Sequence, residues 1–175
     1  MAGVYSVAGS RMMDSTITEV DGLTTIRLAW PESPIGFRVN QLRNMHFRDF
    51  GKRNAYWRDE TFVKLGDGAP ALQWANIVVD EVVASNPNHL PDVGACFPAY
   101  KAALDGLVDV CKILPKDSPE FVRSVTFTTP AYVKGEAWLV ISLTGPARHV
   151  HDDDGCDDCM ACLEPERYDD HTCIG

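Results

Sequence analysis

Residues 91–117, PDVGACFPAYKAALDGLVDVCKILPKD, encode one amphipathic helix between two acidic loops. Apolar residues recur here at spacings of three and four, the period of one helix face, at Tyr100, Ala103, Leu104, Leu107, Val108 and Cys111. Charged residues occupy the other face, Pro98 suits a first helical turn, and Pro115 ends the pattern. The stretch therefore predicts a helix from Pro98 to Cys111 with one side buried.

Asp92 and Asp117 flank this helix in loops that contain turn-forming residues such as Gly94. Two carboxylates and the helix residue Lys101 are groups that a magnesium-dependent phosphodiesterase uses, because Mg²⁺ takes oxygen ligands and an ammonium group stabilises charge on phosphate. The helix spans roughly 20 Å, so its flanking loops must fold back to bring the two acids together. A plain structural interpretation is also open, in which both aspartates are solvated turn residues and Lys101 pairs with Asp105.

The rest of the chain predicts strands around this helix and one further helix. β-branched and aromatic residues predict strands at Thr24–Trp30 and Ile77–Ala84, and an antiparallel pair at 121–129 and 136–145. A second helix is expected at about 55–65. The fold class is therefore mixed α/β (α+β), a small single domain with a mixed β-sheet and two main helices.

Charge separates this domain from the C-terminal end of the chain. The formal net charge is −9, of which residues 145–175 carry −7, from two basic and nine acidic residues. We therefore expect an N-terminal extension at 1–22, the domain at 23–145 and an acidic tail at 146–175. The sequence carries no basic-then-apolar leader and no apolar run of about 20 residues, which favours a cytoplasmic protein without a membrane partner.

A long Pro- and Gly-punctuated loop expected at 31–54 is basic, in contrast to the tail. From residue 38 to residue 58, six basic residues stand against Asp49 alone, a net charge of +5. Such a cluster suits DNA phosphates, and its members are Arg38, Arg43, Arg48, Lys52, Arg53 and Arg58. The same loop contains three aromatic residues, which either stack on unpaired bases or anchor the loop to the core. For each residue taken by itself, we favour the anchoring role; the three are Phe37, Phe47 and Phe50.

The tail concentrates residues that bind zinc. Thiolate and imidazole groups are the ligands that zinc prefers, and here they are Cys156, Cys159, Cys162, His171 and Cys173. Their spacing matches no familiar zinc-finger pattern. A structural Zn²⁺ site and an acidic tail with incidental thiols both remain open.

Four motifs, taken in order, resemble the RusA family of Holliday-junction resolvases, in particular the versions carried by bacteriophages. They are IRLAWPESP, AYWRD after the basic loop, an acid before KAALDGLVD, and an acid just beyond that helix. The resemblance covers roughly residues 24–145. It implies a homodimer of mixed α/β fold in the bacterial host cytoplasm, which binds four-way DNA junctions in recombination, repair and replication. It also implies paired symmetric nicks made with Mg²⁺, or Mn²⁺ in its place, held by aspartates.

The resemblance also implies roles for individual residues. Asp92 matches the first aspartate of the family's Asp-x-Asp motif, Asp117 its later aspartate and Lys101 its helix lysine, so these three are the expected catalytic residues and the two aspartates the expected metal ligands. Gly94 stands where the family has its second aspartate, so one metal ligand is unaccounted for. Either Asp105, a backbone carbonyl or water takes its place, or nothing does, in which case the protein binds junctions but cuts them poorly. The alternative function is a non-enzymatic, zinc-binding nucleic-acid or protein adaptor on a degenerate nuclease fold.

Overall fold

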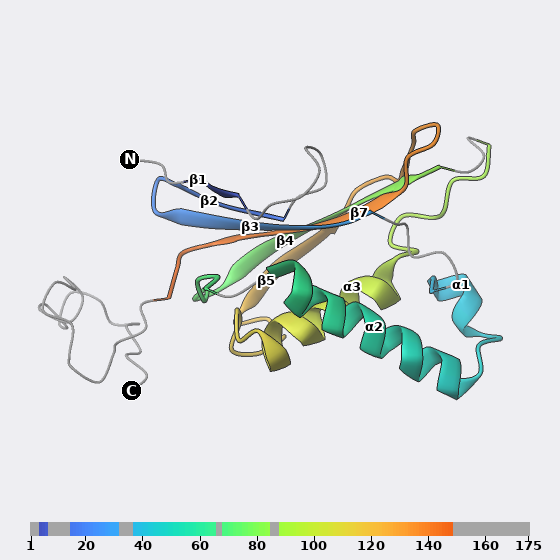
Figure 1. Ribbon diagram of the computed structural model, residues 1–175, viewed down its shortest axis with the longest axis horizontal. Helices are drawn as coiled ribbons and strands as arrows, with labels where there is room; N and C mark the ends of the chain where they lie inside the picture. Colours follow the sequence, from blue (N-terminus) through green and yellow to red (C-terminus); the bar gives the residue numbers. More distant parts are fainter. Residues whose placement is uncertain (1–3, 7–14, 32–36, 66–67, 85–87, 149–175) are drawn as a thin grey trace, which may run out of the picture.

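A computed structural model describes residues 4–6, 15–31, 37–65, 68–84 and 88–148. These residues form one mixed β-sheet with its helices on one face (Figure 1). Seven strands take part, in the order β1-β2-β3-β7-β4-β5 with β6 paired to β4, and their bounds are Val4–Ser6 (β1), Thr16–Val20 (β2), Leu23–Trp30 (β3), Ala75–Val83 (β4), Val122–Phe127 (β5), Ala131–Tyr132 (β6) and Trp138–Gly145 (β7). The predicted α+β class is confirmed.

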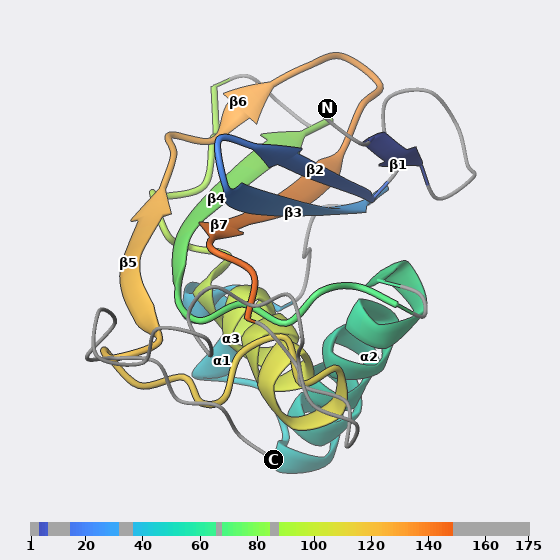
Figure 2. The same ribbon diagram turned by 90° about the vertical axis from the view of Figure 1, so that its left-hand side faces the viewer.

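The centre of the sheet is built from β3, β7 and β4. Strand β7 pairs antiparallel with both of its neighbours, and the helix-facing residues of β4 are buried in alternation, at Ala75, Ile77, Val79 and Glu81. Strands β1 and β2 continue the sheet beyond β3, so part of the segment expected as an N-terminal extension belongs to the domain. Strand β5 pairs parallel with β4 at the opposite edge (Figure 2).

The predicted antiparallel pairing of the last two long strands is wrong. Strand β4 lies between β5 and β7, and β5 runs parallel to it. The physical reason is the connection from β4 to β5. Parallel neighbours need a long crossover, and helix α3 (Phe97–Asp105) supplies one. The hairpin expected from the short separation of the two strands therefore does not form.

The basic segment is helical for more of its length than expected. Helix α1 covers Val39–Leu42, and α2 covers Phe47–Leu65, so α2 begins eight residues before the predicted start. The Nδ1 atom of His46 accepts a hydrogen bond from the Arg48 N–H at 3.3 Å, and this satisfies one of the free donors at the helix start. Trp57 anchors the helix to the sheet, with its ring centroid 5.4 Å from that of Trp30.

The helix predicted at 98–111 is confirmed as α3 followed by a π-helical turn, η1 (Gly106–Val110). Its predicted apolar face is buried in the core, with Tyr100, Ala103, Leu104 and Leu107 each less than 5 % exposed. Helix α2 packs beside it under the sheet (Figure 1). Among the described residues, no helix has the length and apolar character needed to cross a membrane.

Candidate functional site

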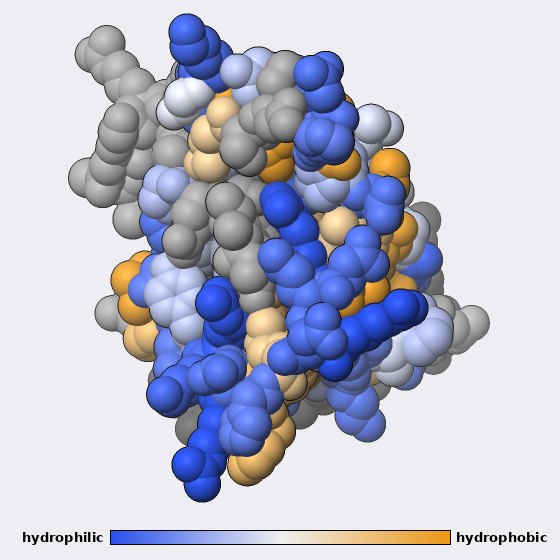
Figure 3. All heavy atoms as spheres, turned by 90° about the vertical axis from the view of Figure 1, so that its right-hand side faces the viewer, coloured by the Kyte–Doolittle hydropathy of each residue, from blue (hydrophilic) through white to orange (hydrophobic). Residues whose placement is uncertain are grey.

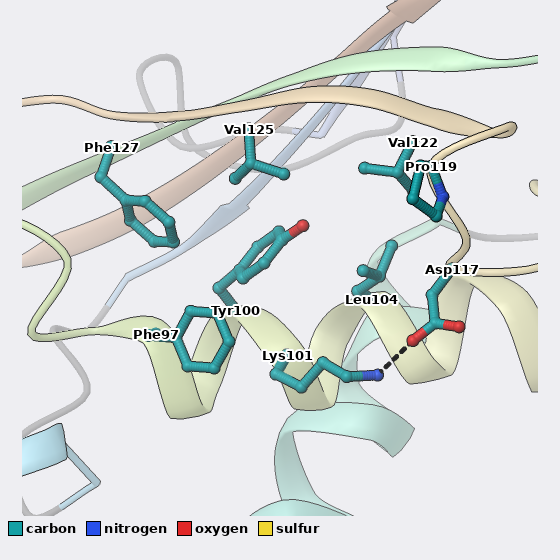
Figure 4. Close-up of a pocket in the computed structure, with 9 residues that line it drawn as sticks. All are labelled: Phe97, Tyr100, Lys101, Leu104, Asp117, Pro119, Val122, Val125 and Phe127. Atoms are coloured by element: carbon teal, nitrogen blue, oxygen red, sulfur yellow. Dashed lines mark hydrogen bonds and ion pairs between the residues drawn. The ribbon is translucent and has the colours of Figure 1, made fainter.

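Lys101 joins two carboxylates on the exposed side of α3. Its Nζ donates a hydrogen bond to Asp117 Oδ2 at 2.7 Å and another to Oδ1 of Asp105, one helical turn further along. The loop after η1 therefore folds back over the helix and brings together two residues that are 16 positions apart. The predicted contact between Lys101 and Asp105 is present. Lys101 and Asp117, two of the three expected catalytic residues, are also in contact (Figure 4).

These contacts stabilise the ionised forms of Lys101 and Asp117. The hydrogen bond from Lys101 and its positive charge hold the pKa of Asp117 below its ordinary value of 3.8. Burial acts to lower the pKa of Lys101, but the hydrogen bonds and negative charges of Asp105 and Asp117 raise it above 10.5. Both side chains are almost half exposed, at 40 % and 48 %, so the pair adds at most about 1 kcal/mol to stability. The cluster carries a formal charge of −1, from one lysine and two aspartates.

Asp92 lies away from this cluster, in the turn before α3. Its carboxylate accepts a hydrogen bond from Asn40 Nδ2 at 3.5 Å, and its backbone carbonyl accepts one from Ala95 at 2.9 Å. Within the part of the chain that the structure describes, no hydrogen bond or ion pair joins Asp92 to Lys101 or Asp117. The structure therefore brings two of the expected catalytic residues together and places Asp92 near α1.

The turn around Asp92 explains why a glycine stands two residues on. Gly94 has a φ of +76°, the left-handed region that favours glycine. A Cβ built there would meet the ring of Phe127 at 3.8 Å, which is ordinary contact, so backbone conformation rather than space selects the residue. An aspartate at this position would carry backbone strain. The backbone conformation of this turn therefore favours the glycine that stands at this position.

Arg38 has a different environment from the other basic residues. Its Nη2 lies 2.6 Å from Oε1 of Glu81, a residue of β4 that is 3 % exposed. This pair lies near Cys96, where burial and the negative charge of Glu81 raise the thiol pKa to about 12. The sequence analysis did not single out Glu81. The signal that could have found it is a carboxylate at an inward-facing position of a strand rich in β-branched residues. The Arg38–Glu81 pair fixes the start of α1 against the sheet.

Four basic residues line the exposed end of the helical layer. Arg43 follows α1, and α2 presents Arg48, Lys52 and Arg53. We call Arg43, Arg48, Lys52 and Arg53 the basic surface. Figure 3 shows this end of the molecule, where hydrophilic side chains gather over α1 and the start of α2. A hollow of about 490 Å³ opens there, lined by Gln41, Asn44, Met45, Asp49, Lys52 and Arg53.

The last member of the predicted DNA-binding set, Arg58, and the three aromatic residues of the basic segment lie partly on the surface and partly in the core. Arg58 lies further along α2, with Nη1 3.7 Å from Asp109 Oδ2 of η1. Phe37 is fully buried, which confirms the core interpretation for this residue, and its ring packs 5.6 Å from that of Phe50. Phe47 is 72 % exposed at the start of α2, so the core interpretation is wrong for this residue, and Phe50 is 41 % exposed.

An apolar pocket of about 250 Å³ adjoins the Lys101 cluster (Figure 4). It opens between α3 and the edge strand β5, and Lys101 and Asp117 stand at its rim. The other lining residues are apolar or aromatic: Phe97, Tyr100, Leu104, Pro119, Val122, Val125 and Phe127. The sequence pattern placed Tyr100 and Leu104 on the buried face of the helix. It gave no signal that strand β5 would complete a pocket with them.

The candidate zinc ligands Cys156, Cys159, Cys162, His171 and Cys173 lie outside the described residues. Among the residues that are described, no group of three or more His, Cys, Asp or Glu side chains is arranged to hold a metal ion. The pair Asp105 and Asp117 nevertheless has the chemistry that Mg²⁺ requires, since this ion is usually held by one or two carboxylates and several waters. Asp105 and Asp117 are therefore the carboxylates beside Lys101 that could hold a magnesium ion.

Comparison with known proteins adds no relative from which a function can be transferred. No protein-family model matches the chain. No curated protein matches it significantly either. A function for this chain is therefore inferred from its own residues.

Proposed function

We propose that this protein is a metal-dependent endonuclease that cuts branched DNA, as the resemblance to RusA resolvases implies. The observation that carries the proposal is the contact of Lys101 with Asp117 and Asp105. It joins Lys101 of α3, which matches the family's helix lysine, to Asp117 of the loop after η1, which matches the family's later aspartate. The mixed α+β fold and the exposed basic surface support it. Four-way junctions are the proposed substrate, and a homodimer is the proposed form, because paired symmetric nicks need two active sites.

The roles of the residues follow from their chemistry. Asp117 and Asp105 would hold Mg²⁺, which supplies an activated water and neutralises phosphate oxygens when bound. Lys101 holds the two carboxylates close together and offers a charged donor to the phosphate or to the leaving oxygen. Asp92 is proposed as a further ligand in the complex with DNA. The basic surface binds phosphates without regard to sequence, which suits an enzyme that recognises the shape of a junction.

A nicking assay on a synthetic mobile four-way junction tests the proposal, with linear duplex as the control substrate and with or without Mg²⁺. The native chain is expected to cut the junction only, and only with Mg²⁺. Asp117→Asn should lower the rate by about 100-fold or more while junction binding persists, because it removes a charged group from the site of the chemistry. Glu120→Gln is the matched control, since it neutralises an exposed carboxylate three residues away without touching Lys101.

The variant Asp92→Asn separates two forms of the proposal. Loss of cutting with retained binding would place Asp92 with the site in the DNA complex, despite its distance from Lys101 in the free protein. Full activity would leave Asp105 and Asp117 as the working carboxylates. Tight junction binding without cutting by the native chain would contradict the enzyme and favour the non-enzymatic adaptor. In that case substitution of the tail cysteines should alter the protein's function, whereas Asp92→Asn should not.

A further inference from the structure

The pocket beside Lys101 contains a tyrosine hydroxyl that is open to the pocket. Tyr100 is 3 % exposed, and within the described residues its hydroxyl takes part in no hydrogen bond. Figure 4 shows this hydroxyl pointing away from α3 toward the β5 side of the pocket. The hydroxyl is not fully enclosed by protein, so a molecule in the pocket can reach it and form a hydrogen bond with it.

The rest of the pocket favours a flat apolar ring. Three aromatic rings line it, with Tyr100 and Phe127 5.4 Å apart and Phe97 5.9 Å from Tyr100. Phe97 is 48 % exposed, a large solvated face for an aromatic residue at the mouth of a pocket. The volume of about 250 Å³ is smaller than the roughly 300–1,000 Å³ typical of pockets for drug-sized ligands. One planar ring with a hydrogen-bonding edge fits these features.

We propose that this pocket binds one unpaired nucleobase of the DNA substrate, next to the phosphodiester bond that is cut. The inference rests on the proposed function and specifies what the site recognises. The base stacks on Phe97 at the mouth and accepts or donates one hydrogen bond at Tyr100. Lys101 and Asp117 at the rim then face the sugar-phosphate backbone of the same nucleotide.

The electrostatics of the pocket support a neutral ligand inside it. Burial raises the pKa of Tyr100 to about 12, so its hydroxyl stays neutral at physiological pH and can donate or accept a hydrogen bond. The two aspartates near Lys101 oppose a free anion in the pocket itself. A nucleobase carries no charge, whereas its phosphate remains outside, at the rim. Stacking on an aromatic side chain tolerates any base, so the pocket is expected to recognise an unstacked base rather than a sequence.

The test uses a short single-stranded oligonucleotide that carries one 5-iodouracil, together with a junction that carries it at the crossover. Phe97→Ala should weaken binding of the single strand by about 5- to 150-fold, the range found for loss of one stacked base. Tyr100→Phe should weaken it by about 2- to 12-fold, for one hydrogen bond, and it keeps the buried ring in place. Phe62→Ala is the matched control, because Phe62 of α2 is also 48 % exposed and does not line the pocket. Irradiation should cross-link the iodouracil to Phe97, Tyr100 or Phe127.

Three results would overturn the inference or separate it from the proposed function. Equal binding by Phe97→Ala and Phe62→Ala, with no cross-link at the pocket, would overturn it even if the junction is cut normally. Conversion of a dimer into a monomer by Phe97→Ala would also overturn it, because a second copy of the chain would then occupy the pocket. Cross-linking at the pocket by a protein that cuts no junction would support the base site and reject the resolvase.

Discussion

Gly106→Ala is expected to destabilise the protein, although alanine is the better helix former. Gly106 begins η1, where the end of α3 meets α2. A Cβ added there would lie 2.7 Å from the backbone oxygen of Arg58 and 3.1 Å from Cβ of Thr61. Backbone atoms of a packed helix cannot rotate away as a side chain can. The two helices would therefore have to separate by several tenths of an ångström.

The expected magnitude is the difference between two effects. Replacing glycine by alanine inside a helix gains about 1 kcal/mol, whereas forcing an extra methyl group into a packed contact costs about 1–3 kcal/mol. Since the closest atom belongs to the backbone, we take the upper end of that cost, about 3 kcal/mol. The net loss is then about 2 kcal/mol, which would lower the melting temperature by roughly 4–8 °C in a chain of this size.

Urea unfolding followed by circular dichroism measures this difference, with Gly51→Ala as the matched control. Gly51 is also helical, but a Cβ built there meets nothing within 4 Å, so the same substitution should stabilise the protein by about 0.5–1 kcal/mol. Unfolding slopes should stay equal, which would show that the folded state keeps its compactness. If Gly106→Ala is as stable as Gly51→Ala, the close packing of α2 on η1 is not present in solution and the reasoning fails.

Two further predictions follow from the same geometry. Cys96 has a thiol pKa of about 12 instead of 9.0, so at pH 8 it should be alkylated about 1,000-fold more slowly in the folded protein than in urea. Peptide mass spectrometry can follow both rates. Comparable rates would show that the thiol is accessible. Removing two phosphate contacts with the double substitution Arg48→Ala and Lys52→Ala should reduce the slope of log binding constant against log salt by about 1.8 on duplex arms. The exposed Lys134→Ala should leave that slope unchanged, and an unchanged slope in the double variant would exclude the basic surface as the DNA contact.

The sequence by itself determined the local elements, because their signals are periodic and short in range. The spacing of three and four predicted the buried face of α3, which the core confirms at Tyr100 and Leu104. The contact of Lys101 with Asp105 was equally readable, since residues four apart are neighbours on any helix. The start of α2 was missed because proline and glycine signals in the basic segment outweighed a helix that depends on Trp57 packing against Trp30.

Only the tertiary structure decided which elements became neighbours. Strand β4 lies between β5 and β7 because α3 crosses over the sheet, and no local pattern in either strand encodes that choice. The same crossover places β5 against α3 and so creates the pocket, and the loop that enters β5 returns Asp117 to Lys101. Periodicity fixes which face of an element is buried, whereas the pairing of distant elements depends on the path of the whole chain. The candidate chemistry was therefore visible as residues in the sequence and became a site only through the fold.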